Sequence, residues 1–461
     1  MRRICFILVA GLDGQLATRA GRTPTLNSFP YRTVLAPVLP AVTCTMQATL
    51  TTGLAPAKHG IIANGLYTHD NPALQRHLDL DNFADFRRQI SFWEQSNALL
   101  EAPRFWSPAL KARTREDRLN RPCRTAMLFW QQSMPDAADI ILTPKPRHTP
   151  EGRTLAACWS RPAALYAELE AKLGSFPLSS YWGPLAGPVA SRWILEAARQ
   201  VWRNYPVDLQ MVYVPMLDYN LQRWGPGHPA LAQEVCDLDA LLAPLVTQVR
   251  AAGATAIIAG DYAMNAVTTS VAPNVALRRA GLLRTQADPQ GKLLIDFQAS
   301  TALAMADHQI AHVYCQPGTA AGAIHVLEKL DGVEQIARSD AQKRQLGLDH
   351  PRSGTLVLLS RPDAWFVHDW WLAEDEKPAW QFGVDIHRKP GYDPRELFFD
   401  AARRGITQDP SLVKGSHGVW PAALDVNRRP VLLSDAPLPT HDSAVPAAAC
   451  AGWLSTLLES A

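Results

Sequence analysis

The chain has 461 residues, 47% hydrophobic and 19% charged, which excludes a disordered chain and is enough to bury a large core. Its 45 Lys and Arg residues nearly balance its 43 Asp and Glu residues, and the net charge of +2 excludes a general nucleic-acid-binding protein. No stretch approaches the roughly 18 consecutive apolar residues of a membrane span, so no membrane partner is predicted.

The chain starts with a short apolar run, residues 4 to 10, that leads into Gly-Leu-Asp-Gly rather than into a small-residue cleavage site. We therefore predict a buried first strand closed by Asp13 instead of a signal peptide. The seven cysteines are scattered without CxxC spacing, which supports neither a disulfide framework nor a zinc knuckle. This cysteine usage is typical of a reducing compartment and predicts a cytoplasmic protein.

The segment from 37 to 65 has a Pro-rich, extended start followed by a helical stretch that ends at Gly53. Thr43 is predicted at or just before the N-terminus of this helix. The exposed amides and the helix dipole there favour an anionic ligand and lower the pKa of a hydroxyl nucleophile. The alternative is that Thr43 only caps the helix.

Residues 83 to 205 are rich in Trp and Pro and lack a regular alternation of strands and helices. We predict that they form an insertion, or cap, over the sheet rather than an independent domain. The core would then consist of residues 1–82 and 206–461. The aromatic side chains of the cap could line a substrate pocket or simply pack in its interior.

Further apolar runs at 209–217, 254–261, 310–315 and 354–360 have the pattern of strands buried on both faces, and the first two are separated by a long helical pattern. The alternation predicts an α/β fold, with a mainly parallel sheet and helices on both faces. Ligands of such sheets bind at the carboxyl ends of the strands, where Asp218 and Asp261 fall. Each acid alone could equally cap a turn or helix. The pattern of residues 446 to 460 predicts one further helix, which we call the closing helix.

Together these segments resemble the alkaline phosphatase superfamily, in particular its branch of nucleotide pyrophosphatases, type I phosphodiesterases and phosphonoacetate hydrolases. The motifs that carry the resemblance follow in the family's order: ILVAGLDG, TPTLNSF, the nucleophile segment ending in TTGL and HGI, VPMLDYNLQRWGP, GDYAM and KGSHG. They span about nine-tenths of the chain. The resemblance implies a three-layer α/β sandwich with a mostly parallel central sheet.

The resemblance also implies a mechanism in which two metal ions, usually zinc, hold a phosphoryl group that a Thr attacks. Carried over by position, Thr43 is the nucleophile. Asp218 and His417 belong to the first metal site, and Asp13 and Asp261 belong to the second.

Three positions depart from the family pattern. The family's histidine four residues after Asp218 is Gln222, its histidine after Asp261 is Tyr262, and its phosphoryl-binding Asn is Met46. Each predicted metal site therefore lacks one imidazole. Losing a donor such as the Asn typically costs about 2.7 to 4 kcal/mol of transition-state stabilisation.

Three hypotheses follow for the chemistry. In the first, the chain cleaves a phosphodiester, pyrophosphate or phosphonate, with replacement ligands drawn from Gln222, Tyr262, His228 or His387. In the second, one ion such as magnesium, manganese or calcium is held mainly by carboxylates. In the third, no metal binds and the scaffold is a biosynthetic enzyme or a binding protein, with Tyr262 and His417 as acid and base.

The predicted substrate is a small anionic molecule, without a nucleic-acid polymer as partner and with the oligomeric state left open. Residues 385 to 393 form a loop rich in charge and turn residues, where His387 and Arg388 are candidates for substrate binding. His59 and His312 are interpreted as structural histidines.

Overall fold

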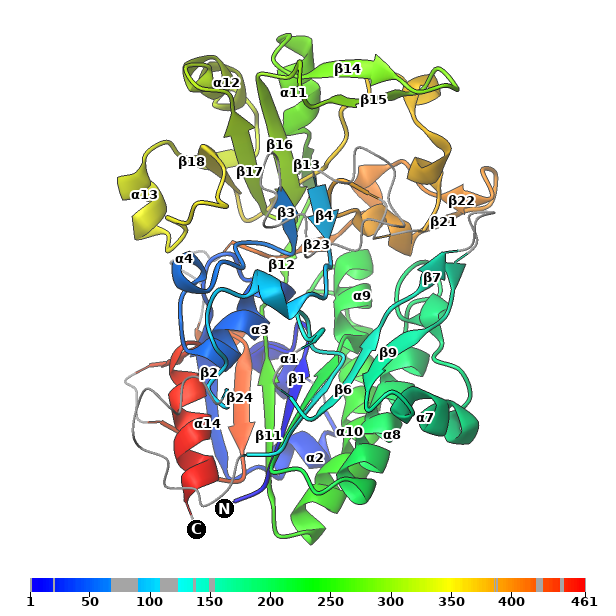
Figure 1. The fold of residues 1–461 in the computed structure, drawn as a ribbon, viewed down its shortest axis with the longest axis vertical. Coiled ribbons are helices and arrows are strands. Elements are labelled where there is room, and N and C mark those ends of the chain that lie inside the picture. The colour runs from blue at the N-terminus through cyan, green and yellow to red at the C-terminus, as the bar shows by residue number, and fades with distance from the viewer. Residues whose placement is uncertain are drawn as a thin grey trace.

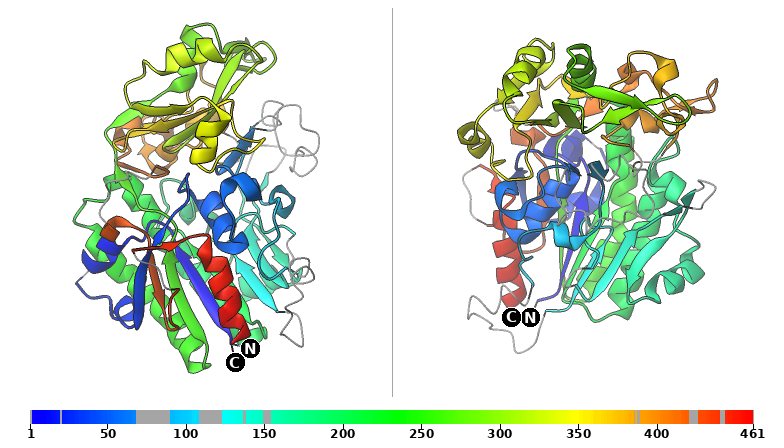
Figure 2. Two further views of the ribbon diagram at one scale, coloured as in Figure 1. Left: turned by 90° about the vertical axis from the view of Figure 1, so that its left-hand side faces the viewer. Right: turned by 45° about the horizontal axis from the view of Figure 1, so that its top comes forward.

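The computed structural model describes residues 2–19, 21–67, 90–107, 123–135, 138–148, 154–384, 386, 389–419, 426–439 and 443–460. Figure 1 shows two lobes, a larger lower one built on a central sheet and a smaller upper one. Two further views show that the upper lobe stands over one end of the central sheet (Figure 2). Within the described residues, no helix is long and apolar enough to cross a membrane.

The central sheet has nine strands, and its middle is parallel. The order across the sheet is β25 (Val445–Pro446), β2 (Tyr31–Ala36), β24 (Val431–Ser434), β11 (Thr255–Gly260), β1 (Ile4–Val9), β10 (Leu209–Val214), β5 (Thr125–Leu128), β6 (Ile140–Pro144) and β9 (Cys158–Arg161). Strands β11, β1, β10, β5 and β6 run parallel to one another, whereas β24 and β9 pair in antiparallel fashion with them. The predicted first strand therefore lies in the middle of the sheet.

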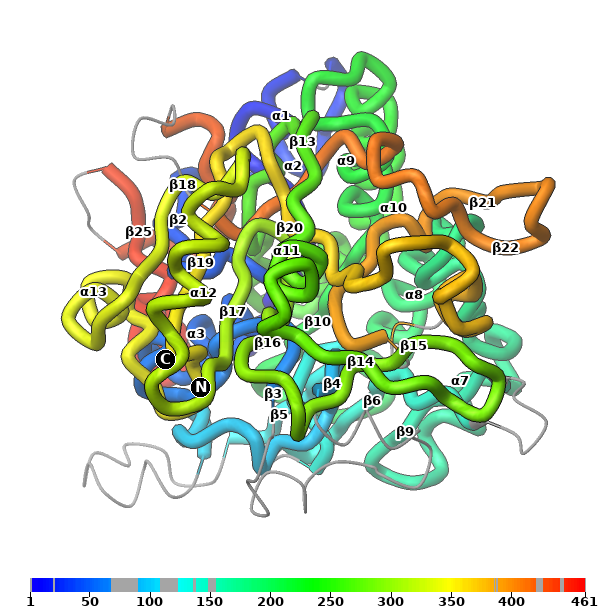
Figure 3. The backbone as a smooth tube through the Cα atoms, turned by 90° about the horizontal axis from the view of Figure 1, so that it is seen from above, coloured from blue at the N-terminus to red at the C-terminus, as the bar shows by residue number. Residues whose placement is uncertain are grey.

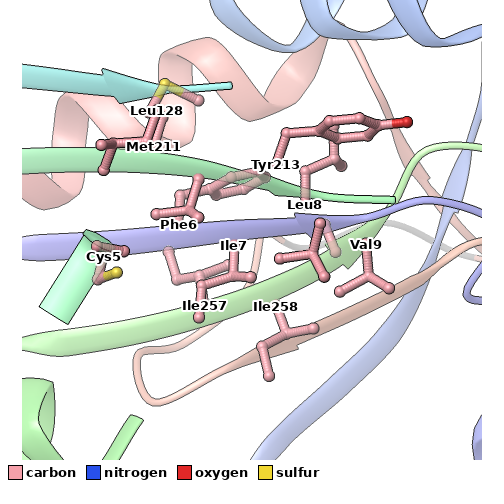
Figure 4. Close-up of a cluster of buried hydrophobic side chains, with 14 of the residues drawn as sticks. Cys5, Phe6, Ile7, Leu8, Val9, Leu128, Met211, Tyr213, Ile257 and Ile258 are labelled. Atoms are coloured by element: carbon pink, nitrogen blue, oxygen red, sulfur yellow. The ribbon is translucent and has the colours of Figure 1, made fainter. Parts of the chain in front are cut away.

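Continuous apolar sequence explains why β1, β10 and β11 occupy the middle of the sheet. Every residue of these three strands is buried, so side chains on both faces need apolar cover. Figure 4 shows side chains of β1, such as Phe6 and Ile7, among neighbours from β10 and β11, such as Met211 and Ile257. At about 25 cal/mol per Å² of apolar surface, this burial is the main stabilising contribution.

Helices cover both faces of the sheet and complete the three-layer sandwich. On one face α8 (Pro188–Asn204) packs against β10 and against the long helix α10 (Leu231–Ala251), which also contacts α1 (Gly14–Arg19) and α2 (Pro24–Asn27). On the other side α3 (Thr43–Thr52) packs against α14 (Ala449–Glu459) (Figure 1). The α/β class, the helix between the second and third apolar runs, and the closing helix are all confirmed.

The upper lobe is built on a separate, antiparallel sheet of four strands. Its order is β16 (Ala302–Asp307), β17 (Ile310–Cys315), β19 (Leu356–Ser360) and β18 (Val333–Ala337), with α11 (Pro273–Arg279) and α12 (Ala320–Leu327) beside it. Seen from above, these strands lie side by side (Figure 3). The apolar runs 310–315 and 354–360 are therefore strands as predicted, but of this lobe and not of the parallel sheet.

The predicted cap over residues 83–205 needs correction. Strands β5, β6 and β9 come from this range and pair within the central sheet, and α8 packs on it. Its aromatic residues Trp130, Trp193 and Trp202 are buried in the central core. The upper lobe comes instead from the part of the chain between β11 and β24. Residues 83–89, 108–122, 136–137 and 149–153 of the predicted cap lie outside the described residues.

All seven cysteines are free thiols, and four of them are buried. The structure thus contains no disulfide framework, as the scattered spacing of the cysteines predicted.

Candidate active site

A cavity of about 620 Å³ opens at the carboxyl ends of the parallel strands. Its walls are mostly aromatic and apolar, and they come from both lobes. From the lower lobe, Thr43, Asp218 and Tyr262 line it, and from the upper lobe His308 and Tyr392 do so. This is the position at which open α/β sheets bind their ligands.

Thr43 is the first residue of α3 and is almost completely buried. Val42 precedes it in an extended conformation, and the helix is closed by Gly53 in the left-handed region, with φ of 72°. The Thr43 Oγ1 lies 3.4 Å from the hydroxyl of Tyr213. The adjacent Cys44 amide donates to Asn64 Oδ1 at 3.0 Å, which fixes the first turn of the helix. The nucleophile candidate therefore sits at a helix N-terminus and faces the cavity.

Asp218 lies at the start of α9 (Met216–Trp224), directly after β10. Its Oδ2 accepts a hydrogen bond from Gln222 Nε2 at 2.6 Å, one helical turn later. Its Oδ1 accepts the Tyr262 hydroxyl at 2.9 Å and lies 3.9 Å from His417 Nε2. Burial raises the pKa of Asp218 to about 6 in spite of these two donors.

Tyr262 and His417 form a stacked pair beside Asp218. Their ring centroids are 3.5 Å apart and the ring planes are nearly parallel, at 4° to each other. His417 Nδ1 lies 2.8 Å from the carbonyl oxygen of Ala41, to which it can only donate, so Nε2 carries the lone pair of the neutral ring. Burial lowers the pKa of His417 well below its ordinary value and raises the pKa of Tyr262 well above 10.

Asp13 and Asp261, the carboxylates predicted for the second metal site, do not line the cavity. Asp13 Oδ1 accepts the Leu16 amide at 2.7 Å, as a residue that caps α1 does. Asp261 Oδ1 accepts the amides of Gly11 at 3.1 Å and Tyr262 at 2.9 Å. The expectation that both acids face the cavity together with Thr43 is therefore corrected.

Burial governs the protonation of both acids. It raises the pKa of Asp13 to about 7 and that of Asp261 well above its usual range. Asp261 Oδ2 is buried and has no hydrogen-bond partner among the described residues. Burial therefore disfavours the charged form of Asp261 in that position.

Sequence reasoning missed the pair formed by Asp307, the last residue of β16, and His308, the first residue of the turn to β17. His308 Nδ1 lies 2.6 Å from Asp307 Oδ1, and the ring stacks on Tyr392 with centroids 3.5 Å apart. Asp307 also accepts the Asn64 amide at 2.7 Å, so Asn64 joins this pair to the first turn of α3. The signal in the sequence was an Asp-His pair at the end of an apolar run. The apolar pattern alone, however, does not show that this turn lies near Thr43.

Four other candidate residues are either outside the described part of the chain or away from the cavity lining. His387 and Arg388 are outside the described residues, although Val384 and Ile386 of the same loop line the cavity. His228, a proposed replacement ligand, packs on Trp224 outside the cavity lining. Met46, at the position of the family's Asn, is fully buried in the central core.

The donor set does not fit a centre of two zinc ions. Within the described residues, no group of three His, Cys, Asp or Glu side chains could hold a metal ion. Both oxygens of Asp218 are engaged by protein donors, and Gln222 presents its N–H group to the carboxylate. Zinc requires lone pairs of Cys, His or carboxylate ligands that converge on one point.

Comparison with known proteins identifies the family. The type I phosphodiesterase / nucleotide pyrophosphatase model matches residues 4–393, and the chain belongs to this family. No curated protein matches the sequence significantly. The alkaline-phosphatase-like architecture and the predicted branch of the superfamily are thereby confirmed.

Solved structures show the same fold at low sequence identity. Murine ectonucleotide pyrophosphatase/phosphodiesterase 5 is 13% identical with a TM-score of 0.58, and 100% of this chain and 96% of that chain are covered. Phosphonoacetate hydrolase from Sinorhizobium meliloti, in complex with phosphonoformate, is 15% identical with a TM-score of 0.60, with 99% and 96% covered. Human ectonucleotide pyrophosphatase/phosphodiesterase 5 has 13% identity, a TM-score of 0.59, and coverage of 100% and 96%.

Proposed function

We propose that the chain is a hydrolase or transferase that acts on a phosphodiester, pyrophosphate or phosphonate through Thr43. The observation that carries the proposal is the position of Thr43, at the N-terminus of α3 in a cavity that Asp218 and His417 also line. Membership of the type I phosphodiesterase family supports the reaction class.

In the proposed reaction, Thr43 Oγ1 attacks phosphorus and displaces the leaving-group oxygen. Nε2 of the neutral His417 accepts the hydroxyl proton and returns it to the leaving group. In the second step, water gives a proton to Nε2 of His417 and attacks the covalent intermediate, the bond from phosphorus to Oγ1 breaks, and His417 returns the proton to Thr43 Oγ1. The contact of His417 with Ala41, two residues before Thr43, supports His417 as the proton acceptor. No metal ion is assigned a step because the donor set does not fit one.

We further propose that the substrate is a diester rather than a monoester, with His387 and Arg388 as contacts for its anionic group. Among the described residues that line the cavity, none is Lys or Arg, so a singly charged diester is accommodated more easily than a dianion. The position of Ile386 in the cavity wall supports a role for this loop. A cytoplasmic location is also proposed, which the seven free thiols support.

Turnover of bis(4-nitrophenyl) phosphate tests the proposal. Thr43→Ala is expected to lose activity by about 1,000-fold or more, as removal of a nucleophile does. Thr45→Ala is the matched control, because Thr45 is buried on the same helix but does not line the cavity. It should keep activity within about threefold. Equal activity of wild type and Thr43→Ala would refute the role of Thr43.

A second candidate is a member without hydrolytic activity whose cavity has been repurposed, as a biosynthetic enzyme or a binding protein. The observation in its favour is that Gln222 and Tyr262 occupy both oxygens of Asp218. Tyr262 and His417 would then serve as acid and base. Absence of turnover with phosphodiester, pyrophosphate and phosphonate probes, with and without added zinc, manganese or magnesium, would favour this candidate.

A further inference from the structure

Two departures from the family pattern converge on a single carboxylate. Gln222 stands where the family has a histidine of the first metal site, and Tyr262 stands where it has one of the second. Gln222 Nε2 donates to Asp218 Oδ2 at 2.6 Å, and the Tyr262 hydroxyl donates to Oδ1 at 2.9 Å. One residue from each family site therefore contacts the same acid.

Both donors are held in place by further contacts. Gln222 Oε1 accepts the hydroxyl of Tyr392 at 2.8 Å, so its amide presents N–H and not oxygen to Asp218. The ring of Tyr262 is fixed by its stack on His417. Gln222 is fully buried and Tyr262 is 1% exposed, so both donors are largely withdrawn from solvent, which strengthens these hydrogen bonds.

Because of these contacts, few lone pairs beside Asp218 are available to a cation. An amide nitrogen has no lone pair to offer, and a protonated phenol that donates to the carboxylate points its hydrogen at the place where an ion would lie. A metal ion at Asp218 would break two buried hydrogen bonds and leave the donors of Gln222 and Tyr262 unsatisfied.

We infer that the hydrogen bonds from Gln222 and Tyr262 to Asp218 replace the first metal ion of the family, so that Asp218 is not a metal ligand in this chain. The inference deepens the proposed function and concerns the same site. Its readout is zinc binding rather than turnover, so its failure is distinguishable from failure of the role proposed for Thr43.

Zinc titration by calorimetry, with metal content measured after gel filtration, tests the inference on the full chain. Wild type is expected to show no zinc binding that depends on Asp218. Gln222→His/Tyr262→Phe supplies an imidazole beside Asp218 and His417 and removes the competing hydroxyl. It should bind one equivalent of zinc, at least about 100-fold more tightly than any zinc that wild type binds, and adding Asp218→Asn should abolish the gain.

Gln222→Met/Tyr262→Phe is the matched control, since it removes both donors without supplying an imidazole, and it should gain no zinc binding. Thermal unfolding of each variant shows whether it is folded. If a double variant fails to fold, the comparison of zinc binding by wild type and by Asp218→Asn tests the inference. Tight zinc binding by wild type that is lost in Asp218→Asn would overturn the inference. So would a folded Gln222→His/Tyr262→Phe variant that binds no zinc. Zinc held by wild type and retained in Asp218→Asn supports the inference, because that ion lies elsewhere.

Discussion

His417 offers the cavity a single basic atom, since its Nδ1 is engaged by Ala41 and its Nε2 is left with the lone pair. Its neighbour His308 lies 3.9 Å away between ring centroids and adopts a positive φ of 57°, which is uncommon for a residue other than Gly or Asn. Residues held in this region cluster at functional sites. The contact with Ala41 thus orients His417, and the backbone conformation places His308.

Replacing the proposed proton acceptor should affect the chemical step more than binding. His417→Gln is expected to lower kcat about 100-fold with KM within about threefold, the range for a general base. The measurement is steady-state turnover of the aryl phosphodiester. His312→Gln is the control, because His312 is a buried histidine of β17 that does not line the cavity. A loss of similar size in both variants would contradict the assignment.

His59 should make stability depend on pH. Its Nδ1 accepts the Ile61 amide, its Nε2 lies 3.0 Å from Thr49 Oγ1, and burial lowers its pKa to about 3. Below about pH 6.5 the unfolded chain binds a proton that the folded chain does not, so the free energy of unfolding falls as pH falls, by about 1.4 kcal/mol per pH unit. Urea unfolding should show that the advantage of wild type over His59→Gln at pH 7.5 shrinks by about 2 kcal/mol at pH 5. An advantage that is the same at both pH values would contradict this prediction.

The sequence predicts the identity of the site residues better than their contacts. Thr43, Asp218, Tyr262 and His417 could be named from motifs and from strand ends, and all four line the cavity. That Gln222 and Tyr262 meet at Asp218 could not be predicted, because Asp218 and Gln222 lie on α9, which follows β10, whereas Tyr262 follows β11, and β1 separates these two strands in the sheet. Spacing along the chain contains no information on such a crossing.

At the scale of elements, the end of β11 shows how closely the sheet approaches the loop after β1. A Cβ placed on Gly260 would lie 2.1 Å from the carbonyl oxygen of Leu12. Only a residue without a side chain allows this approach, which positions Asp261 and Tyr262 immediately afterwards.

Gly260→Ala is therefore expected to lower the free energy of unfolding by about 2 to 3 kcal/mol, since a backbone oxygen cannot move as a flexible side chain does. Gly452→Ala is the contrasting variant, because Gly452 is exposed in the middle of α14 and a Cβ there would meet nothing within 4 Å. It should raise stability by about 0.5 to 1 kcal/mol. Urea unfolding measures both, and equal effects of the two substitutions would contradict the packing argument.

The elements that could be predicted are those with long, uninterrupted patterns. Strand β1 and helices α10 and α14 follow from continuous apolar or helical spacing. Strands β5 and β6 were missed because they contain only four and five residues within Trp- and Pro-rich sequence. The run at 310–315 was predicted as a strand but placed in the wrong sheet, because periodicity does not identify pairing partners.

At the scale of the whole molecule, a buried ionic network in the upper lobe adjoins the loop that reaches the cavity. Arg395, which is fully buried, makes two hydrogen bonds to Asp369 and others to Asp393. Lys389 pairs with Asp393 and Glu396, and Glu396 accepts the indole N–H of Trp182 from the lower lobe. The network thus links the two lobes next to Tyr392, the partner of Gln222.

Removing the central charge of this network should destabilise the chain strongly. Arg395→Leu leaves Asp369 and Asp393 buried without their main partner, and the expected loss is about 3 to 5 kcal/mol in urea unfolding. Arg403→Leu is the control, because Arg403 pairs with Glu374 at the surface and should cause no measurable change. A loss below about 1 kcal/mol for Arg395→Leu would show that the network is replaceable.

The cavity wall also contains tryptophan side chains whose fluorescence can report binding. Of the thirteen tryptophans in the described part of the chain, Trp93 and Trp182 line the cavity and the other eleven do not. A molecule that enters should therefore alter only a small share of the indole emission, and Trp93→Phe should diminish that change without touching Thr43 or His417. The unlabelled protein can in this way reveal its own ligands, whether or not any of them is turned over.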